Sequence, residues 1–177
     1  MDSNRLKGRS PYPFETIGVL VAFTARLEEV LAEAGYLARI LGARLLLIYI
    51  GKETLKLKTT LDEICEHSGL NSPEITRVWL EGDPIKVLLE ICKKNSVDLL
   101  ILETIRREKA LRYYLGSVAR GMSRTAKCSL LLLTEPQKGG TQFRKIVVSG
   151  VLNPIPTRNG VLTLSTFPLQ GPIAVVY

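Results

Sequence analysis

Two kinds of hydrophobic pattern alternate along the chain between residues 15 and 134. Short apolar runs are typical of strands covered on both faces, and they occupy residues 17–23, 45–50, 75–80, 97–102 and 129–133. Between them, apolar residues recur at helical spacing over residues 24–42, 54–68, 84–95 and 116–126. The alternation predicts βαβ units with right-handed crossovers. We therefore expect an α/β fold with a five-stranded parallel doubly wound (Rossmann-like) sheet, in order 3-2-1-4-5, with helices on both faces.

Start and stop residues support these helices. Thr24 is predicted to cap the first helix, and Gly42 to end it. Asp83 followed by Pro84 is a strong start for the third helix, because Asp caps free amides and Pro suits the first helical position. Gly116 and Ser117 begin the last helix.

The remaining sequence divides the chain further. Residues 1–13 are a polar N-terminal extension, 14–136 form the α/β domain, and 137–142 read as a linker. Residues 143–148 repeat the F-x-x-I-x-V pattern of residues 14–19. Frequent prolines then exclude a helix, so residues 143–177 are either the start of a second copy or an irregular tail.

Composition narrows the class of protein. The chain has 177 residues, 46% of them hydrophobic, with three cysteines and one histidine. The cysteines never form a CxxC pair, which argues against a disulfide framework, a structural zinc site or any other metal centre. The longest apolar run, residues 17–23, is too short to span a membrane, and no signal peptide is visible. We expect a cytoplasmic protein that makes no membrane contact.

The net charge of +7 is concentrated in one part of the chain. We call residues 106–127 the basic segment; it carries Arg106, Arg107, Lys109, Arg112, Arg120, Arg124 and Lys127 against Glu108 alone. Such a local field attracts an anionic small molecule or partner, although a solvated helix face beside a charged loop gives the same pattern. Aromatic residues are only 6% of the chain, so we do not expect nucleic-acid binding.

A ligand site is expected where the strand order reverses, at the carboxyl ends of strands one and four. Thr24 follows strand one, and Glu103 follows strand four. The helix that begins at Gly116 and Ser117 offers free amides that suit a phosphate, although Gly-Ser is also an ordinary helix start.

These motifs, in this order, resemble the universal stress protein family over residues 14–136. The family's landmarks are similar to Phe23-Thr24 after strand one and to four later segments, namely 82–84, 97–101, 116–119 and 126–130. The resemblance implies a Rossmann-like domain, a role in stress tolerance, frequent dimerisation through the fifth strand, and ATP binding in some members.

The ATP-binding members carry the pattern G-x2-G-x9-G-S/T. Here Glu103 and Arg106 stand at the first two glycine positions, and Ala22 replaces the opening Asp. Glycine lets the backbone approach a triphosphate without a Cβ in the way, so we expect no ATP in the usual pose and no other cofactor. The residues that remain for a bound nucleotide or other anion are Gly116, Ser117 and Thr24, with Arg106 as a cation.

The chain shows no carboxylate pair, nucleophile–base pair or metal-ligand spacing, so we do not expect an enzyme. The leading interpretation is a universal-stress-protein-like cytoplasmic protein that acts in a stress response through dimerisation and ligand or partner binding. The alternatives are a nucleotide-binding switch or ATPase with a reorganised phosphate site, and one copy of a tandem regulatory protein.

The fifth strand is the predicted dimer interface. It lies at one edge of the expected sheet and lacks the lysine or proline that usually protects an edge. We expect a homodimer that pairs through Ser129, Leu130, Leu131, Leu132 and Leu133. Residues 144–148 are a competing cover for this edge.

Overall fold

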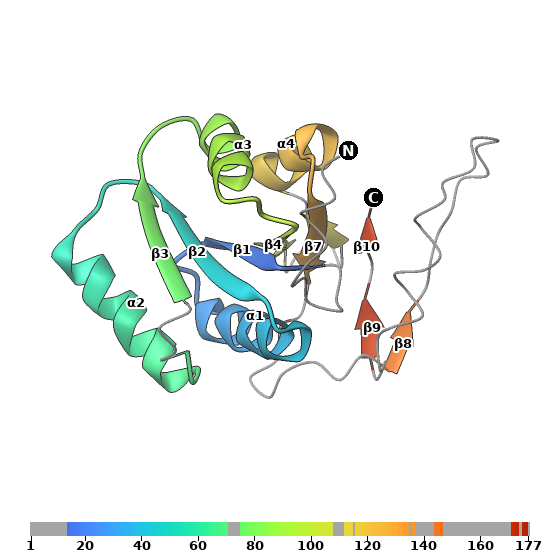
Figure 1. Cartoon of the computed structure of the whole chain (residues 1–177), viewed down its shortest axis with the longest axis horizontal. Helices are drawn as coiled ribbons and strands as arrows, with labels where there is room; N and C mark the ends of the chain where they lie inside the picture. The colour runs from blue at the N-terminus through green and yellow to red at the C-terminus, as the bar shows by residue number, and fades with distance from the viewer. Residues whose placement is uncertain are drawn as a thin grey trace, which may run out of the picture.

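The computed structural model describes residues 14–70, 75–107, 112–114, 116–134, 136, 144–146, 171–173 and 175–176. A sheet lies between two layers of helices (Figure 1). Helices α1 (Leu27–Leu41) and α2 (Leu55–His67) cover one face, and α3 (Pro84–Lys94) and α4 (Ser117–Thr125) cover the other. Within the described residues, none of the helices is both long enough and apolar enough to cross a membrane.

The sheet has the predicted parallel topology. Its five parallel strands run in the order β3-β2-β1-β4-β7, which confirms the expected order 3-2-1-4-5. Their bounds are β1 (Thr16–Val21), β2 (Arg44–Ile50), β3 (Ile75–Leu80), β4 (Leu99–Glu103) and β7 (Ser129–Leu133). A short antiparallel strand, β10 (Val175–Val176), lies beyond β7.

Two hydrophobic cores hold the helices to the sheet. In β2, Leu45 and Leu47 are buried under α1 and α2, whereas Leu46 and Ile48 are buried under α3 and α4. Successive side chains of a strand point to opposite faces, so a strand covered on both faces must be apolar throughout. This is why β2 shows no polar alternation.

Local capping confirms most of the predicted helix ends. Thr54 accepts a hydrogen bond from the Leu57 amide at the start of α2, and Asp83 accepts one from the Lys86 amide, with Pro84 next to it. Gly42 ends α1 with a φ of 61°, a left-handed conformation that favours glycine.

The prediction that Thr24 caps the first helix is wrong. Strand β1 ends at Val21, α1 begins at Leu27, and Arg26 occupies the N-cap position without a side-chain hydrogen bond that caps the helix. The Thr24 hydroxyl instead donates to a carboxylate on a distant strand, described below.

Asp98 directly precedes β4 and joins its beginning to the beginnings of β1 and β7. Its carboxylate oxygen Oδ2 accepts hydrogen bonds from the amides of Glu15 (2.9 Å) and Thr16 (3.0 Å) at the start of β1. The Asp98 amide donates to the Thr16 carbonyl, and the Asp98 carbonyl accepts from the Ser129 amide at the start of β7. A single residue therefore satisfies backbone groups at the amino ends of β1 and β7.

The later segments differ from the sequence prediction. The charged loop after Glu103 contains an antiparallel pair, β5 (Ile105–Arg107) and β6 (Arg112–Tyr114). Strand β8 (Arg144–Ile146) pairs in parallel with β9 (Gly171–Ile173) and does not join the main sheet. The proposed extension 1–13 and linker 137–142 lie outside the described residues.

The edge of β7, which the sequence analysis expects to be unprotected, is partly covered in the structure. Val175 of β10 pairs with Leu131, and Val176 pairs with Leu130. The competing cover predicted from residues 144–148 is likewise wrong for the described part, because β8 pairs with β9 instead.

Candidate functional site

The reversal of strand order lies between β1 and β4. These strands are parallel neighbours, with Val19 opposite Ile101, so their carboxyl ends open on the same side of the sheet. The chain leaves β1 towards α1 on one face and leaves β4 towards α4 on the other. This is the place where open α/β sheets bind ligands.

A tight turn after β1 directs Thr24 into this place. The Thr24 amide donates to the Ala22 carbonyl at 2.7 Å, and the Thr24 hydroxyl accepts from the Arg26 amide at 3.3 Å. The same hydroxyl donates to Oε2 of Glu103, at the end of β4, at 2.8 Å. The sequence placed both residues at this edge, and the structure shows that they contact one another.

Arg26 completes the arrangement, which we call the Thr24–Arg26–Glu103 network. Its Nε lies 3.8 Å from Oε1 of Glu103, and its Nη2 donates to the Thr134 carbonyl after β7 at 2.8 Å. The Glu103 side chain is only 11% exposed. Both carboxylate oxygens therefore have a partner, and the ends of β1, β4 and β7 are joined through side chains.

Thr104 extends the contact between β4 and β7. Its amide and its hydroxyl both donate to the Leu133 carbonyl, at 2.9 and 3.2 Å, and the residue is buried. This double hydrogen bond holds the backbone on which Glu103 sits. The carboxylate is thus positioned by regular sheet structure on one side and by its side-chain partners on the other.

The network is built around a carboxylate that is hydrogen bonded to Thr24 and ion-paired with Arg26. Glu103 places a negative charge where a phosphate-binding site needs free hydrogen-bond donors. The two donors that are present, Thr24 and Arg26, already contact this carboxylate. Arg26, which sequence reasoning did not select, is the cation of the site; its place two residues after Thr24 is the signal that could have identified it. Among the described residues, no cluster of three or more His, Cys, Asp or Glu side chains could hold a metal ion.

The other predicted site residues are not joined to this network by any contact among the described residues. Gly116 is the N-cap of α4 and makes no side-chain cap bond, and Ser117 is exposed. A Cβ on Gly116 would meet nothing within 4 Å, so this helix start faces open space. Arg106 lies in β5 with its backbone opposite Tyr113; its side chain, like Lys109 of the basic segment, lies outside the described residues.

An aromatic cluster lies beside the network. Tyr49 of β2 and Trp79 of β3 are opposite one another in the sheet, with ring centroids 4.8 Å apart. Phe23 lies 5.3 Å from the Tyr49 ring and 6.5 Å from the Trp79 ring. All three are partly buried against the core under α1 and α2, which is a packing role.

The sequence is similar to those of known universal stress proteins. Residues 51–134 match the sequence model of the Universal stress protein family. A universal stress protein of Methanocaldococcus jannaschii is 31% identical over 88 residues, which are 50% of this chain and 48% of that relative. The chain thus matches about half the length of this curated relative.

Solved structures show the same fold. A universal stress protein in complex with cAMP superposes with a TM-score of 0.57 and 20% identity, over 69% of this chain and 98% of that one. A universal stress protein from Archaeoglobus fulgidus has a TM-score of 0.57 and 18% identity, over 68% and 99% of the two chains. Another structure from this organism, in complex with dAMP, has a TM-score of 0.54 and 20% identity, over 69% and 99%. The family resemblance predicted from the motifs is confirmed.

Proposed function

We propose that this protein, whose residues 51–134 match the Universal stress protein family, acts in a stress response by binding a partner or ligand, and that it does not hold ATP in the pose of the family's ATP-binding members. The observation that carries the second part is the position of the Glu103 carboxylate. It stands at the first glycine of the ATP motif and is held there by Thr24 and Arg26.

The electrostatic cost of a phosphate at this carboxylate is large. Taken alone, two unit charges about 4 Å apart near a protein surface repel by roughly 4 kcal/mol, which corresponds to about a thousandfold in affinity. The positive charge of Arg26 offsets part of this repulsion. A phosphate would also have to separate Arg26 from Glu103 before it could use that cation. The repulsion from Glu103 and the need to break the Arg26–Glu103 pair both lower the affinity for a triphosphate. Neither requires a change in the fold.

Calorimetric titration with MgATP tests this proposal. We expect no micromolar binding by the natural chain, and a gain of affinity in Glu103→Gly, which restores the glycine of the motif. Glu103→Gln is the matched control, because it removes the charge and keeps the size of the side chain. Micromolar affinity of the natural chain for MgATP would contradict the proposal.

A second candidate function is nucleotide binding through a reorganised site. It is supported by the uncapped start of α4 at Gly116 and Ser117, and by related folds found in complex with cAMP and dAMP. In this case Arg106 supplies the cation and a monophosphate lies at the helix start. Titration with cAMP and dAMP would then show affinity that falls with salt and is lost in Arg106→Ala.

We further propose that the protein is not an enzyme. Thr24, Arg26 and Glu103 are all engaged in mutual hydrogen bonds or ion pairs that join strand ends. Such a network supports binding or assembly better than proton transfer, which needs a group free to exchange its proton with a substrate.

Dimerisation through β7 is part of the proposal. Only Leu130 and Leu131 of β7 are paired with β10, so a second copy could extend the pairing along the rest of the strand or replace β10. Light scattering on the natural chain separates the cases: a dimer supports the proposal, and a monomer at high concentration indicates that β10 is the only cover.

A further inference from the structure

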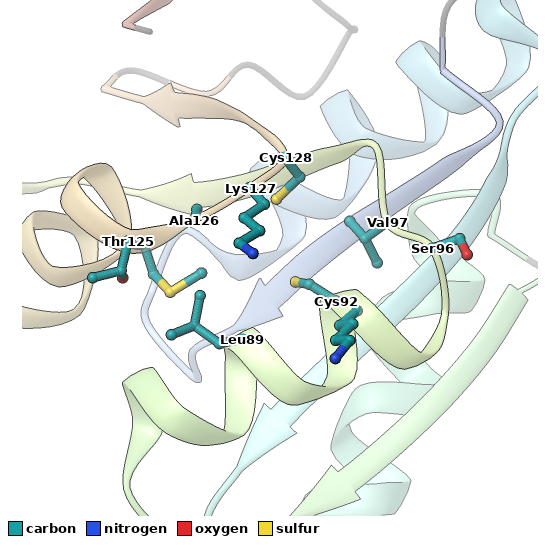
Figure 2. A pocket seen from close by; sticks show the side chains of 10 residues that line it. Leu89, Cys92, Ser96, Val97, Thr125, Ala126, Lys127 and Cys128 are labelled. Carbon is teal, nitrogen blue, oxygen red and sulfur yellow. The ribbon is translucent and has the colours of Figure 1, made fainter. Parts of the chain in front are cut away.

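A cavity of about 360 Å³ opens between α3, α4 and the start of β7. Leu89 and Cys92 of α3 line one side, and Met122 of α4 lines another. Lys127 and Cys128, between α4 and β7, complete it (Figure 2). The cavity lies at the amino ends of β4 and β7, and it is therefore separate from the Thr24–Arg26–Glu103 network at the carboxyl ends.

The fold brings two thiols to this cavity from distant parts of the chain. Cys92 is in the last turn of α3 and is buried, whereas Cys128 directly precedes β7 and is half-buried. Figure 2 shows both sulfur atoms directed into the cavity. The two side chains are hydrogen bonded to one another, and no disulfide joins them.

The hydrogen bond makes the two thiols chemically different. Donation from Cys92 lowers the pKa of Cys128 from the ordinary thiol value, although burial and the nearby Asp98 carboxylate oppose the shift. The same hydrogen bond, together with burial, raises the pKa of Cys92. Cys128 is therefore the sulfur that more readily becomes a thiolate, which is the nucleophilic form.

The third cysteine shows what an inert thiol looks like in this fold. Cys65 of α2 is fully buried and is packed in the core under α1 and α2. Burial raises its pKa, with Arg77 acting in the opposite direction. Cys65 is not among the residues that line the cavity between α3 and α4, so it serves as an internal reference for reactivity.

We propose that Cys128 and Cys92 form a peroxide-reactive dithiol site, in which Cys128 is oxidised first and Cys92 resolves it to an intramolecular disulfide. The oxidant is a hydroperoxide, whose smallest member, hydrogen peroxide, fits readily into a cavity of this volume. Cys128, which is half-buried, reacts with the oxidant. Cys92, which is buried, reacts in the second step.

The reaction balances as two steps. The Cys128 thiolate attacks one oxygen of hydrogen peroxide; the S–O bond forms, the O–O bond breaks, and the released hydroxide takes a proton to become water. The Cys92 sulfur then attacks the Cys128 sulfenic acid; the S–S bond forms, the S–O bond breaks, and the hydroxyl leaves as water with the Cys92 proton. Two thiols are oxidised and one peroxide is reduced to two waters.

The cavity also explains why the second step is open to this pair. A disulfide requires sulfur atoms about 2 Å apart, closer than a hydrogen bond between thiols. Both thiols line this open space, so neither sulfur is enclosed on all sides by core side chains. The bond would tie the end of α3 to the start of β7.

The test is peptide mapping of the full natural chain. Reduced protein is treated with an equal amount of hydrogen peroxide, and remaining thiols are then blocked with N-ethylmaleimide. We expect a Cys92–Cys128 cross-linked peptide, a protein lighter by two hydrogen atoms before blocking, and Cys65 still able to react once the chain is unfolded. A cross-link to Cys65, a disulfide between chains, or three intact thiols would overturn the proposal.

Two matched variants separate the roles of the thiols. In Cys92→Ala the resolving thiol is absent, so Cys128 should accumulate as a sulfenic acid that dimedone traps. In Cys65→Ala the Cys92–Cys128 disulfide should form as in the natural chain. Equal dimedone labelling of Cys128 in the natural chain and in Cys92→Ala would show that Cys92 does not resolve it.

Discussion

The Thr24 hydroxyl donates a 2.8 Å hydrogen bond to the Glu103 carboxylate across 79 positions of sequence. This contact joins the carboxyl ends of β1 and β4, where the strand order of the sheet reverses. Arg26 contacts the other carboxylate oxygen. The position at which this kind of sheet commonly binds an anion is therefore occupied by the chain's own Glu103 carboxylate.

The Thr24–Glu103 contact is expected to stabilise the fold modestly. Thr24→Val keeps the shape and removes the donor, and should lower the free energy of unfolding by about 0.5–1.5 kcal/mol, because the site is partly open to solvent. Urea denaturation measures the loss. In a double-mutant cycle with Glu103→Gln, additive losses would show that the two side chains do not interact.

Asp98 should matter more, because one carboxylate oxygen serves two backbone amides. Asp98→Ala leaves the amides of Glu15 and Thr16 without this acceptor, and should lower the free energy of unfolding by about 2–4 kcal/mol. Asp62→Ala is the control, since the exposed Asp62–Arg77 pair should contribute only about 0–1 kcal/mol. Equal effects of the two variants would contradict the role assigned to Asp98.

Gly121 allows α4 to lie against α3. A Cβ at this position would collide with the Ile85 side chain, so Gly121→Ala should destabilise the protein by about 1–3 kcal/mol, even though Ala favours a helix by about 1 kcal/mol. Gly116→Ser provides the contrast, because that position faces open space and Ser is a good N-cap. Thermal unfolding of both variants checks the difference in sign.

Strand β10 is expected to limit self-association. Val175→Pro places a residue without an amide donor opposite Leu131, which should release β10 and expose the edge of β7. The mass measured by light scattering should then rise with concentration more steeply than for the natural chain. Val175→Ala, which keeps the amide donor, is the control, and an unchanged mass in Val175→Pro would show that β10 does not compete for the edge.

The reactivity of Cys128 should depend on pH in a defined direction. Alkylation follows the thiolate fraction, and an unperturbed thiol has a pKa of about 8.5; since the pKa of Cys128 is lowered, its rate should reach half-maximum below that pH. The groups facing it are Cys92, Asp98, Lys127 and Lys93. In Cys92→Ala the hydrogen bond is lost, so the half-maximum should move to higher pH. Iodoacetamide labelling with peptide quantification measures both profiles.

Much of the fold was predictable because its signals are local. The apolar runs of β2 and β7, the Asp83-Pro84 helix start and the Gly42 stop each lie within a few neighbouring residues. Each acts through backbone geometry that a short segment already possesses. The order of the parallel strands followed from the handedness of βαβ connections, which limits the topologies open to such a chain.

The candidate site was only partly predictable. The strand order placed Thr24 and Glu103 where the order reverses, between β1 and β4. Capping rules, however, assigned Thr24 to the start of α1, since a Thr before an acidic turn is a good local cap. In the structure α1 begins only at Leu27 with Arg26 as its N-cap, and the Thr24 hydroxyl donates to Glu103 on β4. Arg26 was missed although it follows Thr24 by two residues, because its partners, Glu103 and the Thr134 carbonyl, lie far away along the chain.

The sequence by itself determined the helices, the parallel strands and the family resemblance, since these follow from periodicity and from neighbours a few residues apart. Only the tertiary structure decided that Thr24 and Arg26 contact the Glu103 carboxylate, that Cys92 and Cys128 line one cavity, and that β10 pairs with β7. Each of these contacts joins residues far apart along the chain. Their energy depends on distance and burial, which exist only once the sheet has brought the segments together.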